Sequence, residues 1–224
     1  MDLPSLRTAL SRLHTDLSVP HIAFSSIPLR NTTIGRLGLP HPPESYTRLL
    51  PETLLPAYHS VGSGGPEDEV LVCFASSYEN GTMETWAFAL PTIDVPFTGT
   101  GDLLSALCTA WYGLASQVTP SSLSSMPTLA WALSKALLTV QQILLRTYIH
   151  MLGLGERDTA PGRPAVEMGD ATTTKDGSEI RQRAQQLRRR ELRLVQERAL
   201  IADGGAGWDG KRVDWDAVAA VAKE

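Results

Sequence analysis

The sequence is poor in the features that mark secreted or nucleic-acid-coating proteins. Only two of its 224 residues are cysteines. Cys73 and Cys108 are too few for a disulfide scaffold, and they lack the Cys-x-x-Cys spacing of metal or redox sites. The N-terminus has no basic segment followed by an apolar one, so no secretory signal is expected. The net charge of −4 gives no global support for nucleic-acid binding.

Long uninterrupted apolar runs are also missing. The longest, over residues 129–145, is broken by Ser134, Lys135 and two glutamines, so it predicts a buried helix and no membrane contact. The five histidines show no metal-ligand spacing, and no metal site is predicted. Hydrophobic residues make up 42% and charged residues 20%, as in an average globular protein. We therefore expect a cytoplasmic protein of one domain, or one and a half.

Apolar spacing predicts the elements of an α/β protein. In chain order these are a helix over 3–17, a strand over 21–26, strands over 69–75 and 84–90, and helices over about 103–114 and 128–150. Asn80–Gly81, a strong hairpin signal, joins the second and third strands as an antiparallel pair. Three strands and two long helices are few for a closed α/β domain. They would leave too much of the apolar surface of the sheet uncovered.

The other segments are polar. Residues 31–65 are rich in Pro, Gly, Ser and Thr and predict a long mobile insertion between two strands. Residues 151–180 predict a disordered linker. Within 181–224, an arginine-rich stretch is interpreted as a solvated face, with binding to a nucleic acid or an anionic surface as the alternative. The tail with Trp208 and Trp215 is expected to pack loosely, with a docking peptide as the alternative.

The strongest chemical signal lies in residues 97–104. Gly99 and Gly101 flank Thr100 ahead of an apolar helix, and glycines let backbone N–H groups converge with no Cβ in the way. With the positive end of the helix dipole, these amides form a site for an anion such as a phosphoryl group. Asp102 would be repelled by that anion, which makes sense if it accepts the proton of an attacking hydroxyl. The alternative is that Asp102 only caps the helix.

The wider context resembles pyridoxal kinase, within the ribokinase-like superfamily. The stretches that carry the resemblance, in that family's order, are Leu13–His14 through Ser25–Ser26, residues 97–107 with Ala110–Trp111, residues 135–147 and residues 191–196. The resemblance covers only the C-terminal half of such a kinase. It implies an α/β, partial ribokinase-like fold over 1–150, a mainly parallel sheet with flanking helices and an antiparallel hairpin. Leu104 departs from the family's usual Phe, and the family's upstream acidic and Asn/Glu residues are absent.

The resemblance implies that the γ-phosphoryl group of ATP is transferred to the 5′-hydroxyl of pyridoxal, pyridoxine or pyridoxamine. It implies Mg²⁺ bridging the phosphates, a monovalent cation, and a homodimer. Asp102 would be the catalytic base, and the N–H groups of Gly99, Thr100 and Gly101 would hold the charge on the phosphoryl oxygens. The implied nucleotide-binding residues are Ser25 and Ser26 at the phosphates or ribose, Phe97 and Thr98 near the nucleotide, and Leu144 against the adenine.

Two other functions stay open at this stage. The catalytic segment also fits another ribokinase-like kinase, acting on a hydroxymethylpyrimidine or a sugar, because specificity lies mainly in the absent half of the fold. The third hypothesis is a non-catalytic remnant that binds nucleotide weakly or only pairs with other chains. Its support is that a parallel sheet cut midway leaves an unpaired edge and an uncovered apolar face.

Overall fold

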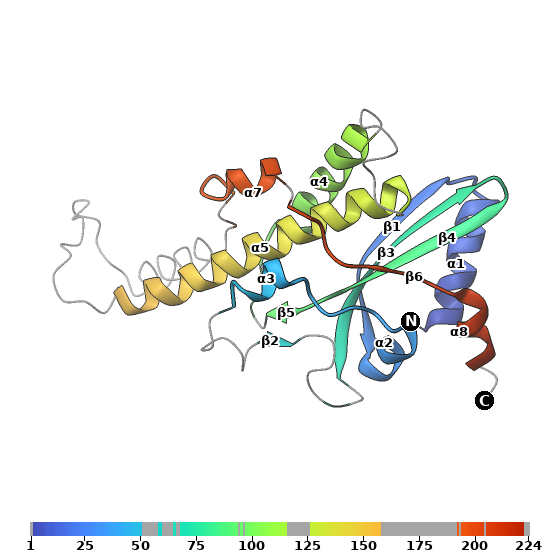
Figure 1. Cartoon of the computed structure of the whole chain (residues 1–224), viewed down its shortest axis with the longest axis horizontal. Coiled ribbons are helices and arrows are strands. Elements are labelled where there is room, and N and C mark those ends of the chain that lie inside the picture. The colour runs from blue at the N-terminus through green and yellow to red at the C-terminus, as the bar shows by residue number, and fades with distance from the viewer. Residues whose placement is uncertain are drawn as a thin grey trace, which may run out of the picture.

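A four-stranded sheet lies between two groups of helices, so the described chain has three layers (Figure 1). The computed structural model describes residues 2–50, 58–59, 65, 68–93, 95, 97–115, 126–157, 192, 194–203 and 205–221. The predicted mixture of helices and strands is confirmed for these residues.

The sheet has the strand order β1-β3-β4-β6, and all of its pairings are antiparallel. Its strands are β1 (His21–Arg30), β3 (Glu69–Glu79), β4 (Thr82–Leu90) and β6 (Lys211–Arg212); β2 (Tyr58–His59) and β5 (Thr92–Ile93) form a separate antiparallel pair. The predicted mainly parallel sheet is therefore wrong for the described residues. Parallel neighbours need a long crossover, whereas β3 and β4 are joined by a tight turn at Asn80 and Gly81, both with positive φ.

Strand β3 is buried on both faces. Val70, Val72 and Phe74 face one helical layer, and Cys73 and Ala75 face the other, as the alternation of side chains along a strand requires. The first layer consists of α1 (Leu3–Thr15), α2 (Asn31–Leu37) and α8 (Trp215–Val221); the second consists of α3 (Glu44–Thr47), α4 (Thr100–Ala115) and α5 (Thr128–Arg157). The expected uncovered apolar face is thus not found in this part of the chain.

The two long segments expected to be irregular contain ordered structure. Within 31–65, helices α2 and α3 bury Ile34, Leu37 and Tyr46, so this part is not a mobile insertion. Residues 51–57 and 60–64 lie outside the described residues. Helix α5 continues to Arg157, so the predicted linker begins with helix, and its remainder, 158–180, also lies outside the described residues.

Helix α5 is the one described helix that is long and apolar enough to cross a membrane, over Thr128–Leu152. Of its most apolar window, 72% is buried inside the structure, which is also the environment of a core helix in a soluble protein. The apolar positions expected for its buried side are confirmed at Leu129, Ala132, Leu133, Ala136, Val140 and Ile143.

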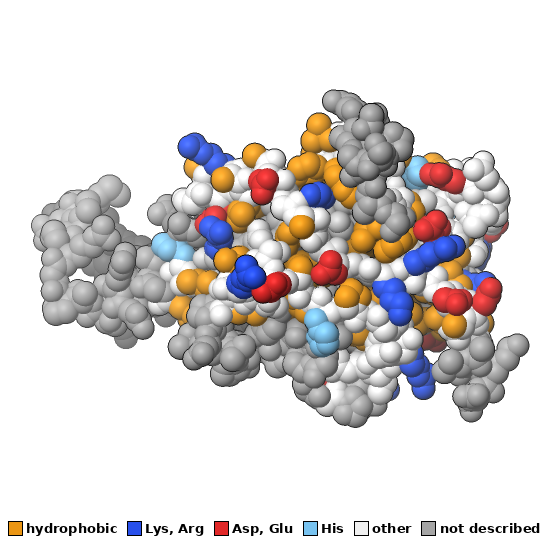
Figure 2. Space-filling model, in the orientation of Figure 1, with side chains coloured by type: hydrophobic (Ala, Val, Ile, Leu, Met, Phe, Trp, Pro, Cys, Tyr) orange, Lys and Arg blue, Asp and Glu red, His pale blue; other side chains and the backbone are white. Residues whose placement is uncertain are grey.

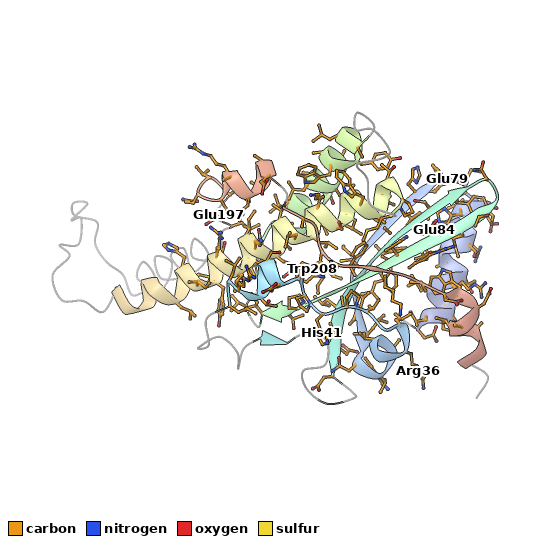
Figure 3. The ribbon with its side chains drawn as sticks, in the orientation of Figure 1. Arg36, His41, Glu79, Glu84, Glu197 and Trp208 are labelled. Atoms are coloured by element: carbon orange, nitrogen blue, oxygen red, sulfur yellow. The ribbon has the colours of Figure 1, made fainter. Side chains whose placement is uncertain are left out.

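Residues 205–215, the strap, run from α7 (Arg198–Asp203) across α5 and the sheet to α8 (Figure 1). Trp208 is almost fully buried between α5 and the sheet (Figure 3). Its Nε1 donates to the Ala89 carbonyl at 2.9 Å, and its backbone N–H donates to the Ser134 carbonyl at 2.9 Å. The expectation of a loosely packed tail is therefore wrong: buried tryptophan surface holds the strap down.

The basic segment before the strap is described only in part. Residues 181–191 lie outside the described residues. Leu194–Glu197 form a turn that leads into α7. Glu197 pairs with Arg146 on α5 at 2.9 Å, which attaches the turn to the domain.

Candidate functional site

A cavity of about 240 Å³ lies where β1, the start of α4 and the middle of α5 meet. Six of the nine residues predicted for the site line this cavity: Ser25, Ser26, Phe97, Thr100, Gly101 and Leu144. They come from three segments that are far apart in the sequence, so the fold brings together most of the predicted site. Thr98, Gly99 and Asp102 are not among the lining residues.

A bulge in β1 presents the two serines to the cavity. The pairing with β3 passes from Phe24 opposite Phe74 to Ile27 opposite Val72, so β1 has one extra residue at this point. Ser26 has φ +58°, a conformation that costs a residue with a Cβ about 1–2 kcal/mol. As a result both serines are exposed instead of alternating between faces.

The start of α4 has backbone amides available for an anion. Gly99 has φ +80°, and its carbonyl accepts the first bond of the helix, from the Leu103 N–H at 3.0 Å. The first N–H groups of a helix have no partner within it. Within the described part of the chain, the N–H groups of Gly99, Thr100 and Gly101 donate to no protein acceptor. These are the groups that the sequence predicted would hold a phosphoryl group.

Asp102 lies in the first turn of α4, with an exposed side chain. Because the helix begins at Thr100, Asp102 is its third residue, and the alternative that it is the N-cap is wrong. Its carboxylate makes no hydrogen bond or ion pair with any described residue. The helix dipole at this end favours a negative charge, so the carboxylate is stabilised without a local partner.

Helix α5 forms the apolar wall opposite the serines. Leu144 is half-buried on this wall, where the sequence placed an adenine contact. Gln141 also lines the cavity, and the sequence analysis did not assign it a role. The sequence did point to Gln141, because it lies in an apolar helix and a buried glutamine normally has a polar partner.

Cys73 lies directly behind the bulge. The Ser26 N–H points to its Sγ, 3.5 Å away. Burial raises the pKa of the Cys73 thiol to about 11, an effect that the contact with Ser26 partly offsets. Burial also raises the pKa of Cys108. Both cysteines are free and buried.

The described residues contain no group of three or more His, Cys, Asp or Glu side chains that could hold a metal ion. Mg²⁺ in phosphotransferases usually keeps several waters and is held by one or two carboxylates together with substrate phosphates. Asp102 is the one carboxylate in the first turn of α4. Such a donor set would suit an ion bound mainly through the phosphates of a ligand.

Comparison with solved structures finds pyridoxal kinase of Leishmania donovani. Its complex with ADP and pyridoxamine has a TM-score of 0.40 and 16% identity, over 70% of this chain and 40% of the kinase. Its complex with ADP has a TM-score of 0.47 and 15% identity, over 95% and 45%. Its complex with ADP and ginkgotoxin has a TM-score of 0.38 and 19% identity, over 65% and 35%.

The chain thus spans less than half the length of these kinases. Pyridoxal kinase is also the family that the sequence resembles. No family model and no curated protein matches the sequence. With TM-scores below 0.5, the structural similarity by itself says nothing about activity or substrate.

Proposed function

We propose that this chain is a pyridoxal kinase-like phosphotransferase, which moves the γ-phosphoryl group of ATP to the 5′-hydroxyl of a pyridoxal-type substrate. One observation carries the proposal: two exposed hydroxyls and the unpartnered amides of Thr100 and Gly101 line a single cavity, and the unpaired carboxylate of Asp102 follows in the same turn of α4. Ser25, Ser26 and Asp102 are exposed, so these groups are open to a ligand.

The amides at the start of α4 are the proposed phosphoryl site. The N–H groups of Gly99, Thr100 and Gly101 would donate to the phosphoryl oxygens as negative charge develops on them. The left-handed backbone at Gly99 supports this role, because it turns the chain sharply into the helix. Preorganised donors of this kind act without rearrangement during the reaction.

Asp102 is the proposed general base. It would accept the proton of the substrate hydroxyl as that oxygen attacks phosphorus, which is worth about 10²–10⁴-fold in rate. Its exposure and lack of a partner support this role, because a carboxylate already bound to a cation would be a weaker proton acceptor.

Ser25 and Ser26 would donate to the phosphates or the ribose, while Leu144 and Phe97 would pack against the base. The volume of about 240 Å³ is below the 300 Å³ or so of a typical ligand pocket, so the cavity would enclose one part of the nucleotide. Mg²⁺, bound with the phosphates, would neutralise part of their charge.

The test is ATP-dependent phosphorylation of pyridoxal by the purified chain and by Asp102→Asn. We expect turnover by the wild type, a fall in kcat of about 10²–10⁴-fold in Asp102→Asn, and unchanged ATP binding. Asp216→Asn is the matched control, since Asp216 lies in the first turn of α8, and it should retain activity.

Three results would reject the proposal. ATP binding without turnover would favour the non-catalytic remnant. Phosphorylation of a sugar or a hydroxymethylpyrimidine alone would favour another ribokinase-like kinase. Full activity of Asp102→Asn would remove the carboxylate from the mechanism.

A further inference from the structure

A second and larger cavity lies on the opposite helical layer, between the first turn of α1, α2, the end of β1, β6 and α8. Its volume is about 1000 Å³, at the upper end of the range for ligand-binding pockets. We call it the basic groove. It shares no lining residue with the candidate site, so it is a separate place for a ligand.

Four cationic side chains line the basic groove: Arg30, Arg36, Lys211 and Arg212. All four are exposed, and Figure 2 shows Lys and Arg side chains gathered on this part of the face. Arg36 extends from α2 at the edge of the molecule (Figure 3). The ammonium of Lys211 lies against Gly38, 2.7 Å from where a Cβ would be, and Gly38 is two residues beyond Arg36. Lys211 therefore lies beside the end of α2, the helix that carries Arg36, and both side chains line the groove.

The acidic residues that line the basic groove form no ion pair with these two cations. Asp2 accepts the Ser5 N–H at 2.8 Å and caps α1. Asp214 accepts the first N–H groups of α8 at 3.0 Å and caps that helix. Glu69 makes no ion pair with any described residue.

Among the four cations, Arg212 is held by Glu84 from outside the groove, at 3.8 Å. Arg36 and Lys211 form no ion pair or hydrogen bond with any described residue. These two are the cations that a ligand would meet.

The floor of the basic groove is apolar. Pro4, Pro28 and Val218 line it with exposed or half-buried apolar surface. An inorganic anion would use the cations and leave this floor in contact with water. A ligand with a ring-sized apolar body would cover it, at a gain of about 25 cal/mol for each Å² of apolar surface removed from water.

We propose that the basic groove binds a small phosphate monoester with a ring-sized apolar body. The dianionic phosphate pairs with Arg36 and Lys211, and the body lies on the apolar floor. Arginine forms two parallel hydrogen bonds to a phosphate, and lysine supplies a compact second charge. This site is independent of the proposed function, so its failure would leave the phosphotransferase proposal unchanged.

Phenyl phosphate is the probe, measured by calorimetric titration of the full chain in the presence of a saturating non-hydrolysable ATP analogue. We expect phenyl phosphate to bind more tightly than either inorganic phosphate or phenol. The double variant Arg36→Gln/Lys211→Gln should weaken binding by about tenfold or more, the effect of losing one charged hydrogen bond. Arg36→Lys keeps the charge but not the paired hydrogen bonds, so its affinity for phenyl phosphate should lie between those of the wild type and the double variant.

Arg48→Gln/Arg198→Gln removes the same charge from exposed positions outside the groove and should bind as the wild type does. Circular dichroism confirms folding of each variant. The proposal is overturned if the ATP analogue displaces phenyl phosphate, if the Arg36/Lys211 variant binds normally, or if the control variant weakens binding equally. Equal binding of phenol would also overturn it, because the anionic group would then contribute nothing.

Discussion

Two pairs of serines on neighbouring strands show that the same residue type can have two opposite roles. Ser76 and Ser77 in β3 are buried and bonded: Ser76 contacts His14 Nε2 at 2.8 Å, and Ser77 contacts His21 Nδ1 at 3.2 Å. Ser25 and Ser26 in β1 are exposed at a cavity, and their hydroxyls have no partner within the described part of the chain. The first pair stabilises the fold, whereas the second is available to a ligand.

Ser76, of the bonded pair, belongs to a chain of hydrogen bonds with one direction. His14 Nδ1 lies 2.5 Å from the Val19 carbonyl, which only accepts, so Nδ1 carries the proton and Nε2 accepts from Ser76. The Ser76 hydroxyl then accepts from Thr85 at 3.1 Å, and Thr85 accepts from Trp215 Nε1 at 3.0 Å. Each hydroxyl is satisfied as both donor and acceptor, which is why this group can be buried.

Replacing Trp215 should have the largest effect on the bonded side. Trp215→Ala removes a buried ring and the donor to Thr85, and should lower the free energy of unfolding by about 3–5 kcal/mol. Trp215→Phe keeps much of the packing and should cost about 1–3 kcal/mol for the lost hydrogen bond. Urea unfolding measures both. Equal losses would show that the hydrogen-bond chain contributes nothing beyond packing.

Cys73, behind the exposed pair, should make stability fall at alkaline pH. Its pKa in the folded state, about 11, lies above the ordinary thiol value of 9.0, because the thiol is buried. The unfolded chain therefore loses this proton first, so stability is full below about pH 9 and falls as the pH rises towards 11. The loss should reach about 2–3 kcal/mol. Urea unfolding from pH 8 to 11 should show a smaller decline in Cys73→Ala than in the wild type. Identical declines would contradict the buried position of the thiol.

The two serine pairs themselves give a direct comparison. Ser76→Ala leaves His14 Nε2 without its donor in a buried position, and should cost about 1–3 kcal/mol. Ser25→Ala should change stability by less than about 0.5 kcal/mol, because its side chain is exposed. If the proposed function holds, Ser25→Ala should instead raise the KM for ATP. The comparison fails if Ser25→Ala is the more destabilising change.

Ser26→Gly should have a small effect on stability, with the opposite sign. Removing the Cβ relieves about 1–2 kcal/mol of left-handed strain, while the extra freedom of glycine in the unfolded chain returns about 0.5–1 kcal/mol. We expect a net stabilisation of about 0.5–1 kcal/mol in thermal unfolding. Ser76→Gly is the matched control and should destabilise. A loss of stability in Ser26→Gly would mean that its side chain supports the bulge.

The sequence predicted best those features that arise from local patterns. Helical spacing of leucines gave α1, and Asn80–Gly81 gave the turn between β3 and β4. The glycines at the start of α4 predicted backbone amides without a partner, because a glycine affects the backbone of residues close to it in the sequence. Most of the predicted site residues lie at one cavity, although their roles stay predictions.

Features that depend on distant contacts were missed. Nothing near Trp208 shows that it packs against Tyr46 and donates to Ala89, because these partners are far away in the sequence. The bulge at Ser25–Ser26 depends on the register with β3. The antiparallel order of the sheet depends on the edge and the direction in which each strand joins it. The spacing of residues within a strand carries no information about this position or direction.

The irregularity of β1 has a consequence for solubility. Among the described strands, β1 pairs with β3 alone, so β1 is an edge strand. The N–H and C=O groups on its other side could pair with a strand of another molecule, as in amyloid-like aggregation. The extra residue at the serines interrupts the regular series of donors and acceptors, and Pro28 removes one N–H a little further along. The same distortion that presents two hydroxyls to the cavity thus also shortens the stretch onto which a foreign strand could add, and it protects the protein from aggregating through this edge.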